Sequence, residues 1–508
     1  MEKFDVCVLG AGPSGFAAAM RAIDYGHRVA LVERGKVGGA GLFNGALSSK
    51  TLWELSESYK LTRNTQLGYT VYDSELNFSS VMNQAHRAVV EKHSQLKQQI
   101  AYFQKSGQLQ FFQGHGKFNS KNEIDITDAQ GGQHRLWADN TVMAIGSRPR
   151  YLPHIPIDEK TILTSDGISG LTDFPKSMVI LGAGVIGCEF ATIFSNFGKT
   201  KVFLIDKEEH ILPFEDEDIS HAVAANLESN GVVIHHGASL DQMRIVNGKV
   251  EYVLTYKDGR HETYTVEKAL ISVGRVANSE NLGLDAAGVL LNDRGNIEDE
   301  HTRSNVPNIY AVGDFTADIS LVNVGELEGR HAIERIYGIP HKPLVYENIS
   351  TIMFLNPEVA SVGLNEKQAR QRKIPYRIAV MHYRYVNRAI AMSKVDGFFK
   401  ILVTDDDEMK ILGMRVMGSH ASSTIMAVAL MISMDIGIAH LAELIFPHPS
   451  IPEGIQECAR MLMGNSIVKP EVFNLDVRCY RVSVDGRIDD IEFKAENRSG
   501  IPNSGTSH

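Results

Sequence analysis

Two glycine-rich segments carry the residue types and the spacing that bind a dinucleotide. In the first, "GAGPSG", Gly10, Gly12 and Gly15 stand between an apolar run and a run of small, helix-forming residues. In this context the first glycine permits a tight turn, the second lets a pyrophosphate approach the backbone, and the third allows close helix packing. Glu33 ends the next apolar run, where its carboxylate can accept both ribose hydroxyls. The first segment therefore predicts a nucleotide site.

The second segment, "GAGVIG", repeats this layout further along the chain. Gly182, Gly184 and Gly187 are its three glycines, and Asp206 ends the apolar run that follows. A carboxylate at this position favours NAD over NADP, because a 2′-phosphate would meet a like charge. A lysine and a histidine just beyond it weaken the preference, so we expect NADH with NADPH as the less favoured alternative. Two such sites in one chain imply hydride transfer between two dinucleotides.

The bulk composition limits the kinds of partner and site. The 508 residues are enough for about three domains. The formal net charge of −10 provides no basic surface, so nucleic acid is not an expected partner. The four cysteines contain no C-x-x-C or other close pair, which argues against a zinc site, and we expect no bound metal. This cysteine usage suits a reducing compartment. The four residues are Cys7, Cys188, Cys458 and Cys479.

The sequence also lacks the patterns of membrane and export segments. Its most apolar window, "TIMAVALMISM", is followed by Asp435 and Gly437 and is too short to cross a bilayer. We expect a buried helix there and no integral membrane segment. A strand pattern that begins at about Phe4 leaves no room for a signal or transit peptide. The expected location is therefore cytoplasmic.

The hydrophobic pattern indicates which elements must hold the glycine motifs. Each motif lies between two buried strands, which is the layout of a βαβ unit. Residues 80–104 have a helical pattern, and short strands are expected in "QLQFFQGHGKF", "RLWADNTVMAIGSRPR", "KALISVGRVAN" and "NIYAVGDFT". From about residue 348 to 464, strands in "EVASVGL", "GFFKILVT" and "KILGMRVMG" are followed by helices, which predicts an α+β domain. The tail has one strand-like piece, "VRCYRVSV", before a segment predicted to be disordered.

Several motifs together resemble those of the pyridine nucleotide-disulfide oxidoreductases, with dihydrolipoamide dehydrogenase as the most similar pattern. The resemblance covers about residues 4–464 and rests on "GAGPSG", "AIGSRP", "GAGVIGCEF", "SVGRVANSENLGL", "NIYAVGDF" and "HPSIPE". It implies FAD at the first glycine motif, NAD(H) at the second, and a homodimer formed through the C-terminal domain.

The resemblance also implies a fold class and a set of domain boundaries. The expected class is α/β, with two Rossmann-like dinucleotide-binding domains, for FAD and NAD, and a C-terminal α+β dimerisation domain. The expected boundaries are 1–150 for the FAD-binding domain, 151–273 for the NAD(P)H-binding domain, 274–346 for the return to the FAD-binding and central domain, 347–464 for the dimerisation domain, and 465–508 for a partly disordered C-terminal extension.

Four residues match family positions that line the cofactors. Asp314 in "VGDF" matches the acid that holds the ribityl chain of FAD, and Gly146 in "AIGS" matches a turn near the flavin pyrophosphate. The backbone of His115 in "GHG" matches the adenine contact. Gly274, in "SVGR", matches the turn on the nicotinamide side.

Two pairs of residues match catalytic positions of the family. Lys50 and Glu189 match a pair beside flavin N5, where a cation favours electron-rich reduced flavin and a carboxylate holds the cation in position. His448 and Glu453 match a dyad that moves a proton and reaches the flavin of the partner subunit. The alternative for this dyad is a purely structural role at the dimer interface.

The segment before Lys50 departs from the family pattern. The family reads roughly G-G-T-C-L-N-V-G-C-I-P-S-K, whereas this chain reads "GGAGLFNGALSSK", with Gly41 and Ala46 at the two cysteine positions. Thiol–disulfide exchange needs one thiolate to attack and a second to close the ring, and neither residue can supply one. We therefore expect no reduction of disulfides, lipoamide or mercuric ion.

Loss of both sulfurs leaves room for a flat acceptor against the flavin. Asn44, Ser48 and Ser49 could supply polar contacts to it. Phe43 and Trp53 could stack on a ring, although packing between helices is the commoner role of such aromatic residues.

The expected function is therefore that of a FAD-dependent NAD(P)H dehydrogenase. Electrons would pass from NADH through FAD directly to a small planar, quinone-like acceptor. The alternatives are a soluble pyridine nucleotide transhydrogenase, and a dihydrolipoamide dehydrogenase-like protein whose flavin is non-catalytic or senses redox state.

Overall fold

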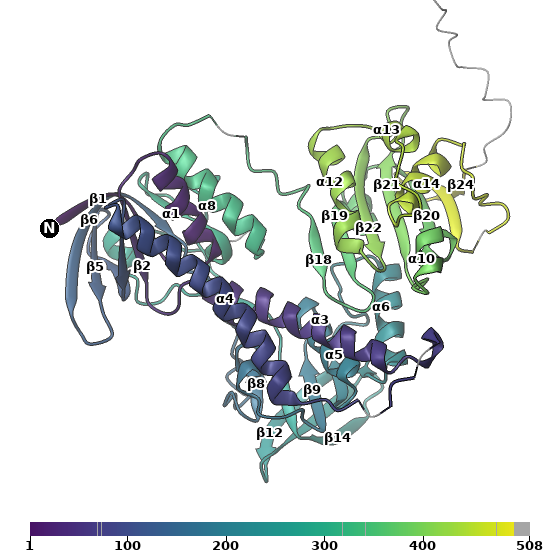
Figure 1. The fold of residues 1–508 in the computed structure, drawn as a ribbon, viewed down its shortest axis with the longest axis horizontal. Coiled ribbons are helices and arrows are strands. Elements are labelled where there is room, and N and C mark those ends of the chain that lie inside the picture. Colours follow the sequence, from purple (N-terminus) through teal and green to yellow (C-terminus); the bar gives the residue numbers. More distant parts are fainter. Residues whose placement is uncertain (69, 73, 317–318, 341, 474, 492–508) are drawn as a thin grey trace, which may run out of the picture. The chain divides into compact units, whose positions relative to one another are not determined.

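The computed structural model describes residues 1–68, 70–72, 74–316, 319–340, 342–473 and 475–491. The chain divides into two compact units (Figure 1). The first comprises residues 1–212 and 224–346, and the second comprises residues 213–223 and the chain from Glu347 onward. The predicted disordered end of the tail, residues 492–508, lies outside the described residues.

The first unit contains a seven-stranded sheet in the order β3-β2-β1-β6-β5-β4, with β17 beside β6. Strands β3, β2, β1, β6 and β17 pair in parallel, whereas β4 and β5 add an antiparallel edge. The strands are β1 (Glu2–Leu9), β2 (Val29–Glu33), β3 (Leu109–Gln113), β4 (His115–Phe118), β5 (Glu123–Thr127), β6 (Gln133–Met143) and β17 (Ile309–Ala311).

From Val6 to Leu9, strand β1 is buried on both faces, which explains its continuous apolar sequence there. Val6 and Val8 join one core cluster with residues of helix α1 (Pro13–Asp24), whereas Cys7 and Leu9 join another. Helices α1, in dark purple, and α8 (Val322–Ile336), in teal, lie side by side (Figure 1). The long helix α4 (Phe78–Lys105) confirms the helix predicted over residues 80–104.

A second parallel sheet, in the order β11-β10-β9-β15-β8, holds the second glycine motif. Its strands are β8 (Ile162–Thr164), β9 (Ser177–Leu181), β10 (Lys201–Ile205), β11 (Val233–His235) and β15 (Lys268–Ile271). The antiparallel strands β12 (Ala238–Val246), β13 (Lys249–Tyr256) and β14 (His261–Val266) form a separate sheet, and β7 (Ser147–Pro149) pairs with β16 (Arg275–Ala277). The helices that follow the two motifs and their loops are α2 (Gly39–Phe43), α3 (Ala46–Thr62), α5 (Val185–Phe197), α6 (Glu217–Ser229) and α7 (Leu284–Ala287).

The second unit is built on a seven-stranded antiparallel sheet in the order β18-β19-β22-β21-β20-β23-β24. The strands are β18 (Thr351–Met353), β19 (Val359–Gly363), β20 (Tyr376–His382), β21 (Phe398–Thr404), β22 (Ile411–Met417), β23 (Val477–Val482) and β24 (Ile488–Asp490). The helices are α9 (Glu366–Gln371), α10 (Asn387–Ala391), α11 (Ala421–Thr424), α12 (Met426–Ser433), α13 (Ala439–Glu443) and α14 (Glu453–Leu462). Strands β19, β21 and β22 are the three predicted from the sequence.

The strand predicted in "VRCYRVSV" is present as β23, and it does more than the sequence suggested. It pairs over its own whole length with β20, so residues assigned to a C-terminal extension complete the sheet of this unit. An ion pair joins Arg481 of β23 to Asp405, and Asp405 also binds Arg377 of β20. The hydrophobic pattern of a single strand cannot reveal its partner, because pairing depends on the rest of the fold.

The helix predicted in "TIMAVALMISM" is present as α12, but it is buried on one face only. Helix α12 buries Val428 and Met431 against the sheet, whereas Met426, Leu430 and Met434 are 64%, 60% and 59% exposed. These three residues are spaced four apart and form one apolar stripe. Apolar residues on every face of a helix do not by themselves show which of those faces the same chain covers. No helix in the described part of the chain combines the length and the apolarity needed to cross a membrane.

Candidate functional site

The first glycine motif forms a tight turn between β1 and α1. Gly10 has a φ of +105°, and a Cβ placed there would lie 2.2 Å from the carbonyl oxygen of Ala144. A Cβ at Gly15 would lie 1.9 Å from the carbonyl oxygen of Gly10, so both positions exclude side chains. A Cβ at Gly12 would meet no protein atom within 4 Å. The open side of Gly12, at the start of α1, is where a pyrophosphate can approach the helix N-terminus.

The second glycine motif repeats this geometry between β9 and α5. Gly182 has a φ of +102°, and its Cβ position lies 2.6 Å from the carbonyl oxygen of Ser272. The Cβ position of Gly187 lies 1.9 Å from the carbonyl oxygen of Gly182, whereas that of Gly184 meets nothing within 4 Å. Two closed positions and one open position therefore recur in both motifs. This is the pattern that a bound dinucleotide requires.

The acid at the end of each second strand is tied to its glycine turn. Glu33 accepts hydrogen bonds from the backbone N–H groups of Ala11 at 2.7 Å and Gly35 at 2.6 Å. Asp206 likewise accepts from the N–H groups of Ala183 at 2.7 Å and Glu208 at 2.9 Å. Each carboxylate oxygen keeps a second lone pair, which a ribose hydroxyl can use.

The structure brings two further predicted residues, His115 and Gly146, to the first motif. The N–H of Gly114 donates to the carbonyl oxygen of Glu33 at 2.9 Å, which places His115 beside the end of β2. Gly146, with a φ of +64° and open space at its Cβ position, follows the segment that contacts Gly10. Gly274, with a φ of +100°, is also open.

Asp314 is held by two residues that the sequence did not single out. The Oγ of Ser147 donates to Asp314 Oδ2 at 2.5 Å, and Arg275 Nε lies 3.8 Å from the same oxygen. Arg275 also donates to Ser147 Oγ at 2.7 Å. Each directly follows a glycine that was predicted, Gly146 or Gly274, and that adjacency was the available signal.

Lys50 of α3 and Glu189 of α5 are in direct contact where the two helices pack. Lys50 Nζ lies 2.7 Å from Glu189 Oε2. The Glu189 side chain is buried, whereas that of Lys50 is partly exposed. These residues are far apart in the sequence, and their pairing agrees with the expected arrangement. A cation held by a buried carboxylate has a defined position, which is what electrostatic stabilisation of a developing charge requires.

His448 and Glu453 form the expected dyad in the second unit. His448 Nδ1 lies 2.7 Å from Glu453 Oε1, and Glu453 Oε2 accepts from the N–H of Ser450 at 2.7 Å. The peptide bond between His448 and Pro449 is cis. Because Nδ1 contacts the carboxylate, Nε2 lies on the other side of the ring. The His448 side chain is 63% exposed, so Nε2 can exchange a proton.

Comparison with known proteins identifies the family. Residues 4–329 match the family model described as pyridine nucleotide-disulphide oxidoreductase, and residues 349–459 match the dimerisation domain of the same family. The chain belongs to the pyridine nucleotide-disulphide oxidoreductase family. It is 33% identical over 474 residues to a dihydrolipoyl dehydrogenase of Chlamydia muridarum, covering 92% of this chain and 99% of that protein. It is 32% identical over 476 residues to a dihydrolipoyl dehydrogenase of Bacillus subtilis, with the same coverage.

Solved structures of the family have the same fold. LpdA from Mycobacterium tuberculosis matches with a TM-score of 0.83 at 25% identity, covering 91% of this chain and 100% of that one. The HOCl-induced flavoprotein disulfide reductase RclA from Escherichia coli matches with a TM-score of 0.80 at 23% identity, covering 90% of this chain and all of its own. At that identity the second match shows the fold alone.

FAD and NAD(H) are the cofactors of this oxidoreductase family. The two glycine turns fit them, because each combines an open backbone position with a tied carboxylate at the ribose position. Bound together, these cofactors supply a hydride donor and a two-electron acceptor. Among the described residues, no group of three or more histidine, cysteine, aspartate or glutamate side chains could hold a metal ion.

The segment "GGAGLFNGALSSK" has no sulfur and little space for one at Gly41. A Cβ at Gly41 would lie 3.0 Å from Cγ of Pro13 and 3.3 Å from Cγ2 of Val322. The amide of Asn44, in the same segment, hydrogen-bonds Asp166, which is half-buried. Burial raises the pKa of Asp166, and the charge of Arg275 and the Asn44 hydrogen bond oppose this effect.

The four cysteines lie elsewhere, and all are buried and free of disulfide bonds. Burial raises the pKa of each thiol above its ordinary value, which disfavours the reactive thiolate. The fold brings Cys458 and Cys479 into one core cluster, although they are distant in the sequence. Because both are buried, they serve as packing residues and not as a redox pair.

The aromatic residues near Lys50 have packing partners. Trp53 is buried, which agrees with the helix-packing role favoured for it from the sequence. Phe43 lies edge-on to His93, with ring centroids 5.3 Å apart, and Lys36 Nζ lies 4.8 Å from the Phe43 centroid. Both rings therefore have packing contacts within the chain.

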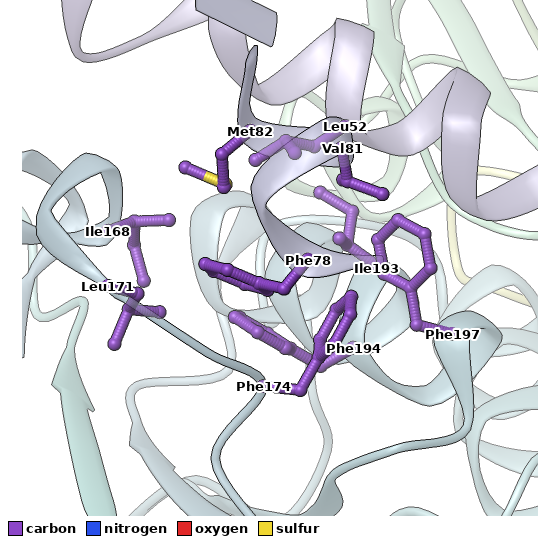
Figure 2. Close-up of a pocket in the computed structure, with 10 residues that line it drawn as sticks. All are labelled: Leu52, Phe78, Val81, Met82, Ile168, Leu171, Phe174, Ile193, Phe194 and Phe197. Atoms are coloured by element: carbon purple, nitrogen blue, oxygen red, sulfur yellow. The ribbon is translucent and has the colours of Figure 1, made fainter. Parts of the chain in front are cut away.

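An apolar pocket lies near Trp53, lined by α3, α4, α5 and the segment from Ile168 to Phe174 (Figure 2). Its ten labelled side chains are all hydrophobic, with Leu52, Phe78 and Ile193 from the three helices. The cavity measures about 10 Å³, which is close to the least space that one buried water needs. It is too small to receive a planar acceptor.

Proposed function

We propose that the chain is a FAD-dependent NAD(P)H dehydrogenase that passes electrons to a non-disulfide acceptor. NADH would bind at Gly182, Gly184, Gly187, Asp206 and Gly274. FAD would bind at Gly10, Gly12, Gly15, Glu33, His115, Gly146 and Asp314. The observation that carries the proposal is that Gly41 and Ala46 stand where the family has its redox cysteines, while the remaining cysteines are buried.

The reaction of a quinone balances without a thiol. NADH gives up a hydride, which carries two electrons and one proton, and the quinone takes one further proton to become a quinol. Lys50, held in position by Glu189, would stabilise the negative charge that accompanies reduction. His448 and Glu453, contributed by a second copy of the chain in a homodimer, would supply the proton.

A dihydrolipoyl dehydrogenase-like function is the second candidate, and the names of the relatives favour it. Both relatives described above are dihydrolipoyl dehydrogenases and match over nearly the whole chain. This candidate requires thiol chemistry at a position without thiols, or a flavin that is not catalytic. Transhydrogenation between nicotinamides is a third possibility that needs no thiol.

An acceptor panel separates these candidates. The purified holoenzyme is mixed with NADH or NADPH and then with a quinone, thio-NAD, ferricyanide, O₂ or a disulfide, and dihydrolipoamide oxidation is measured with NAD. We expect NADH to bleach the flavin absorbance without O₂, and a quinone to restore it. Turnover of lipoamide or another disulfide at a rate comparable to that of the quinone would overturn the proposal. A flavin that NADH does not bleach would instead favour a non-catalytic cofactor.

A further inference from the structure

Glu328 is a buried carboxylate that the proposed reaction does not use. It lies on α8 and is only 1% exposed. Its Oε2 accepts a hydrogen bond from the backbone N–H of Gly313 at 2.6 Å, and its Oε1 accepts from the hydroxyl of Tyr346 at 2.9 Å. Burial of a carboxylate is costly unless hydrogen bonds compensate for lost water. The two bonds supply that compensation and fix the direction of the side chain.

The peptide that Glu328 binds directly precedes Asp314. Gly313 has a φ of +69°, a backbone conformation that other residues rarely adopt. Its carbonyl oxygen accepts from the Oγ1 of Thr316 at 3.0 Å and from the Thr316 N–H at 2.9 Å. The Gly313 residue is thus held at its N–H by Glu328 and at its carbonyl by Thr316. These two contacts fix the peptide before Asp314, whose side chain is held in turn by Ser147 and Arg275.

The same face of α8 also sets the position of the first glycine motif. Cβ atoms at Gly313 and Gly325 would each lie 2.3 Å from Ser14 Oγ, and one at Gly329 would lie 2.2 Å from the Ser14 carbonyl oxygen. Ser14 belongs to "GAGPSG" at the start of α1. Gly325, Glu328 and Gly329 are spaced three and four residues apart, so they share one face of the helix. One helix face therefore contacts two of the segments assigned to FAD, the first glycine motif and the turn before Asp314.

We propose that Glu328 is a positioning residue for FAD, which holds Asp314 in register with the first glycine motif. This inference rests on the placement of FAD at Asp314 in the proposed function. Removal of the carboxylate frees the Gly313 turn, so Asp314 no longer meets the ribityl chain in one fixed orientation.

The test is FAD binding to the full-length apoprotein of Glu328→Met, which keeps side-chain volume but removes the hydrogen-bond acceptor. We expect the Kd for FAD, measured from quenching of flavin fluorescence, to rise about tenfold or more. The visible absorption bands of the bound flavin should also lose resolution. Glu328→Gln retains a carbonyl acceptor for the Gly313 N–H and should keep the Kd within about threefold of the wild type. Glu326→Gln changes an exposed carboxylate on the same helix and is the matched control.

The outcomes distinguish this inference from the proposed function. Far-UV circular dichroism of each apoprotein first checks the fold. Wild-type affinity and an unchanged flavin spectrum in Glu328→Met overturn the inference, provided that Asp314→Asn weakens FAD binding. Wild-type affinity in Asp314→Asn instead overturns the placement of FAD at that residue. If Glu328→Met does not fold, Thr316→Val tests the other side of the same peptide, and wild-type FAD affinity in that variant also overturns the inference.

Discussion

Gly41 shows how a single residue restricts the chemistry of the segment before Lys50. A side chain at this position would press on Pro13 and Val322, at distances of 3.0 and 3.3 Å from its Cβ. We predict that Gly41→Cys together with Ala46→Cys lowers the free energy of unfolding by about 1–3 kcal/mol through overpacking. Urea unfolding of the holoprotein under reducing conditions measures this change.

Addition of Val322→Ala to the double variant should recover part of the lost stability, because it removes the methyl group nearest to the new Cβ. Ala46→Cys alone is the control, because it places no side chain at Gly41. A double variant as stable as the wild type would show that the loop accepts the sulfur without strain. Disulfide chemistry at this loop would then depend only on whether the two cysteines are present.

The pair of Lys50 and Glu189 permits a second prediction at the scale of single residues. Lys50→Met removes the cation that lies 2.7 Å from a buried carboxylate. The uncompensated charge of Glu189 would then oppose accumulation of negative charge on a reduced flavin. We expect reduction by NADH to slow by about tenfold or more, measured by anaerobic stopped-flow absorbance. Glu54→Gln, on the exposed face of α3, serves as control, and an unchanged rate in Lys50→Met would remove this pair from the reaction.

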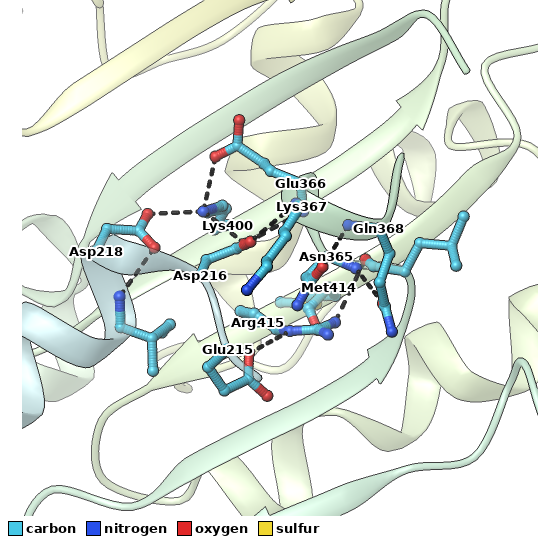
Figure 3. A network of polar contacts seen from close by, with 12 residues as sticks. Glu215, Asp216, Asp218, Asn365, Glu366, Lys367, Gln368, Lys400, Met414 and Arg415 are labelled. Carbon is cyan, nitrogen blue, oxygen red and sulfur yellow. Dashed lines mark hydrogen bonds and ion pairs between the residues drawn. The ribbon is translucent and has the colours of Figure 1, made fainter. Parts of the chain in front are cut away.

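At the scale of elements, buried ion pairs attach the segment of residues 213–223 to the sheet of the second unit (Figure 3). Lys400 of β21 is 1% exposed and lies 2.8 Å from Asp216, 2.7 Å from Asp218 and 2.8 Å from Glu366 at the start of α9. Burial alone would lower the pKa of Lys400, but the three carboxylates outweigh it and raise that pKa. The ammonium therefore stays charged and holds the segment and α9 together.

Lys400→Met should destabilise the second unit by about 3–5 kcal/mol, because it leaves the carboxylates around it without their cation. Urea unfolding followed by circular dichroism measures the loss. Lys410→Met is the matched control, since the side chain of that lysine is 38% exposed and pairs with Glu408 and Asp435. Equal effects of the two substitutions would mean that the Lys400 cluster contributes no more than a surface ion pair.

One buried and one partly buried histidine, His235 and His382, give the whole molecule a predicted pH dependence. Burial lowers the pKa of His235 and His382 below their ordinary value of 6.5. Just below that pH the unfolded chain binds protons that the native imidazoles resist, so stability falls as the pH drops. The contribution is fully present above about pH 6.5. We expect the thermal midpoint to fall between about pH 7.5 and pH 5.5.

His235→Phe keeps an aromatic ring but cannot titrate, so its thermal midpoint should fall less over the same pH range. His86→Phe removes an exposed histidine on α4 and should leave the pH dependence unchanged. If His235→Phe and the wild type lose the same stability on acidification, groups other than His235 dominate the acid response.

Local sequence patterns predicted most of the nucleotide-binding architecture. Gly10 and Gly182 need positive φ angles, and Gly15 and Gly187 need the absence of a Cβ, so these requirements are visible in the residue types themselves. The pairs formed by Lys50 with Glu189 and by His448 with Glu453 were also expected, through resemblance to a known family. Ser147, Arg275 and Glu328 were not singled out, because a common residue type becomes informative only when its neighbours in space are known.

The sequence by itself determined that the chain has two glycine turns of the dinucleotide-binding type, an acid at the end of the strand that follows each, and no cysteine at positions 41 and 46. These features depend on local backbone geometry or on composition, and both can be read along the chain. Only the tertiary structure decided that β23 completes the sheet at β20, that α12 leaves an apolar stripe exposed, and that Glu328 binds the peptide before Asp314. Those features depend on contacts between distant residues, and hydrophobic patterns give the burial of a face without naming what covers it.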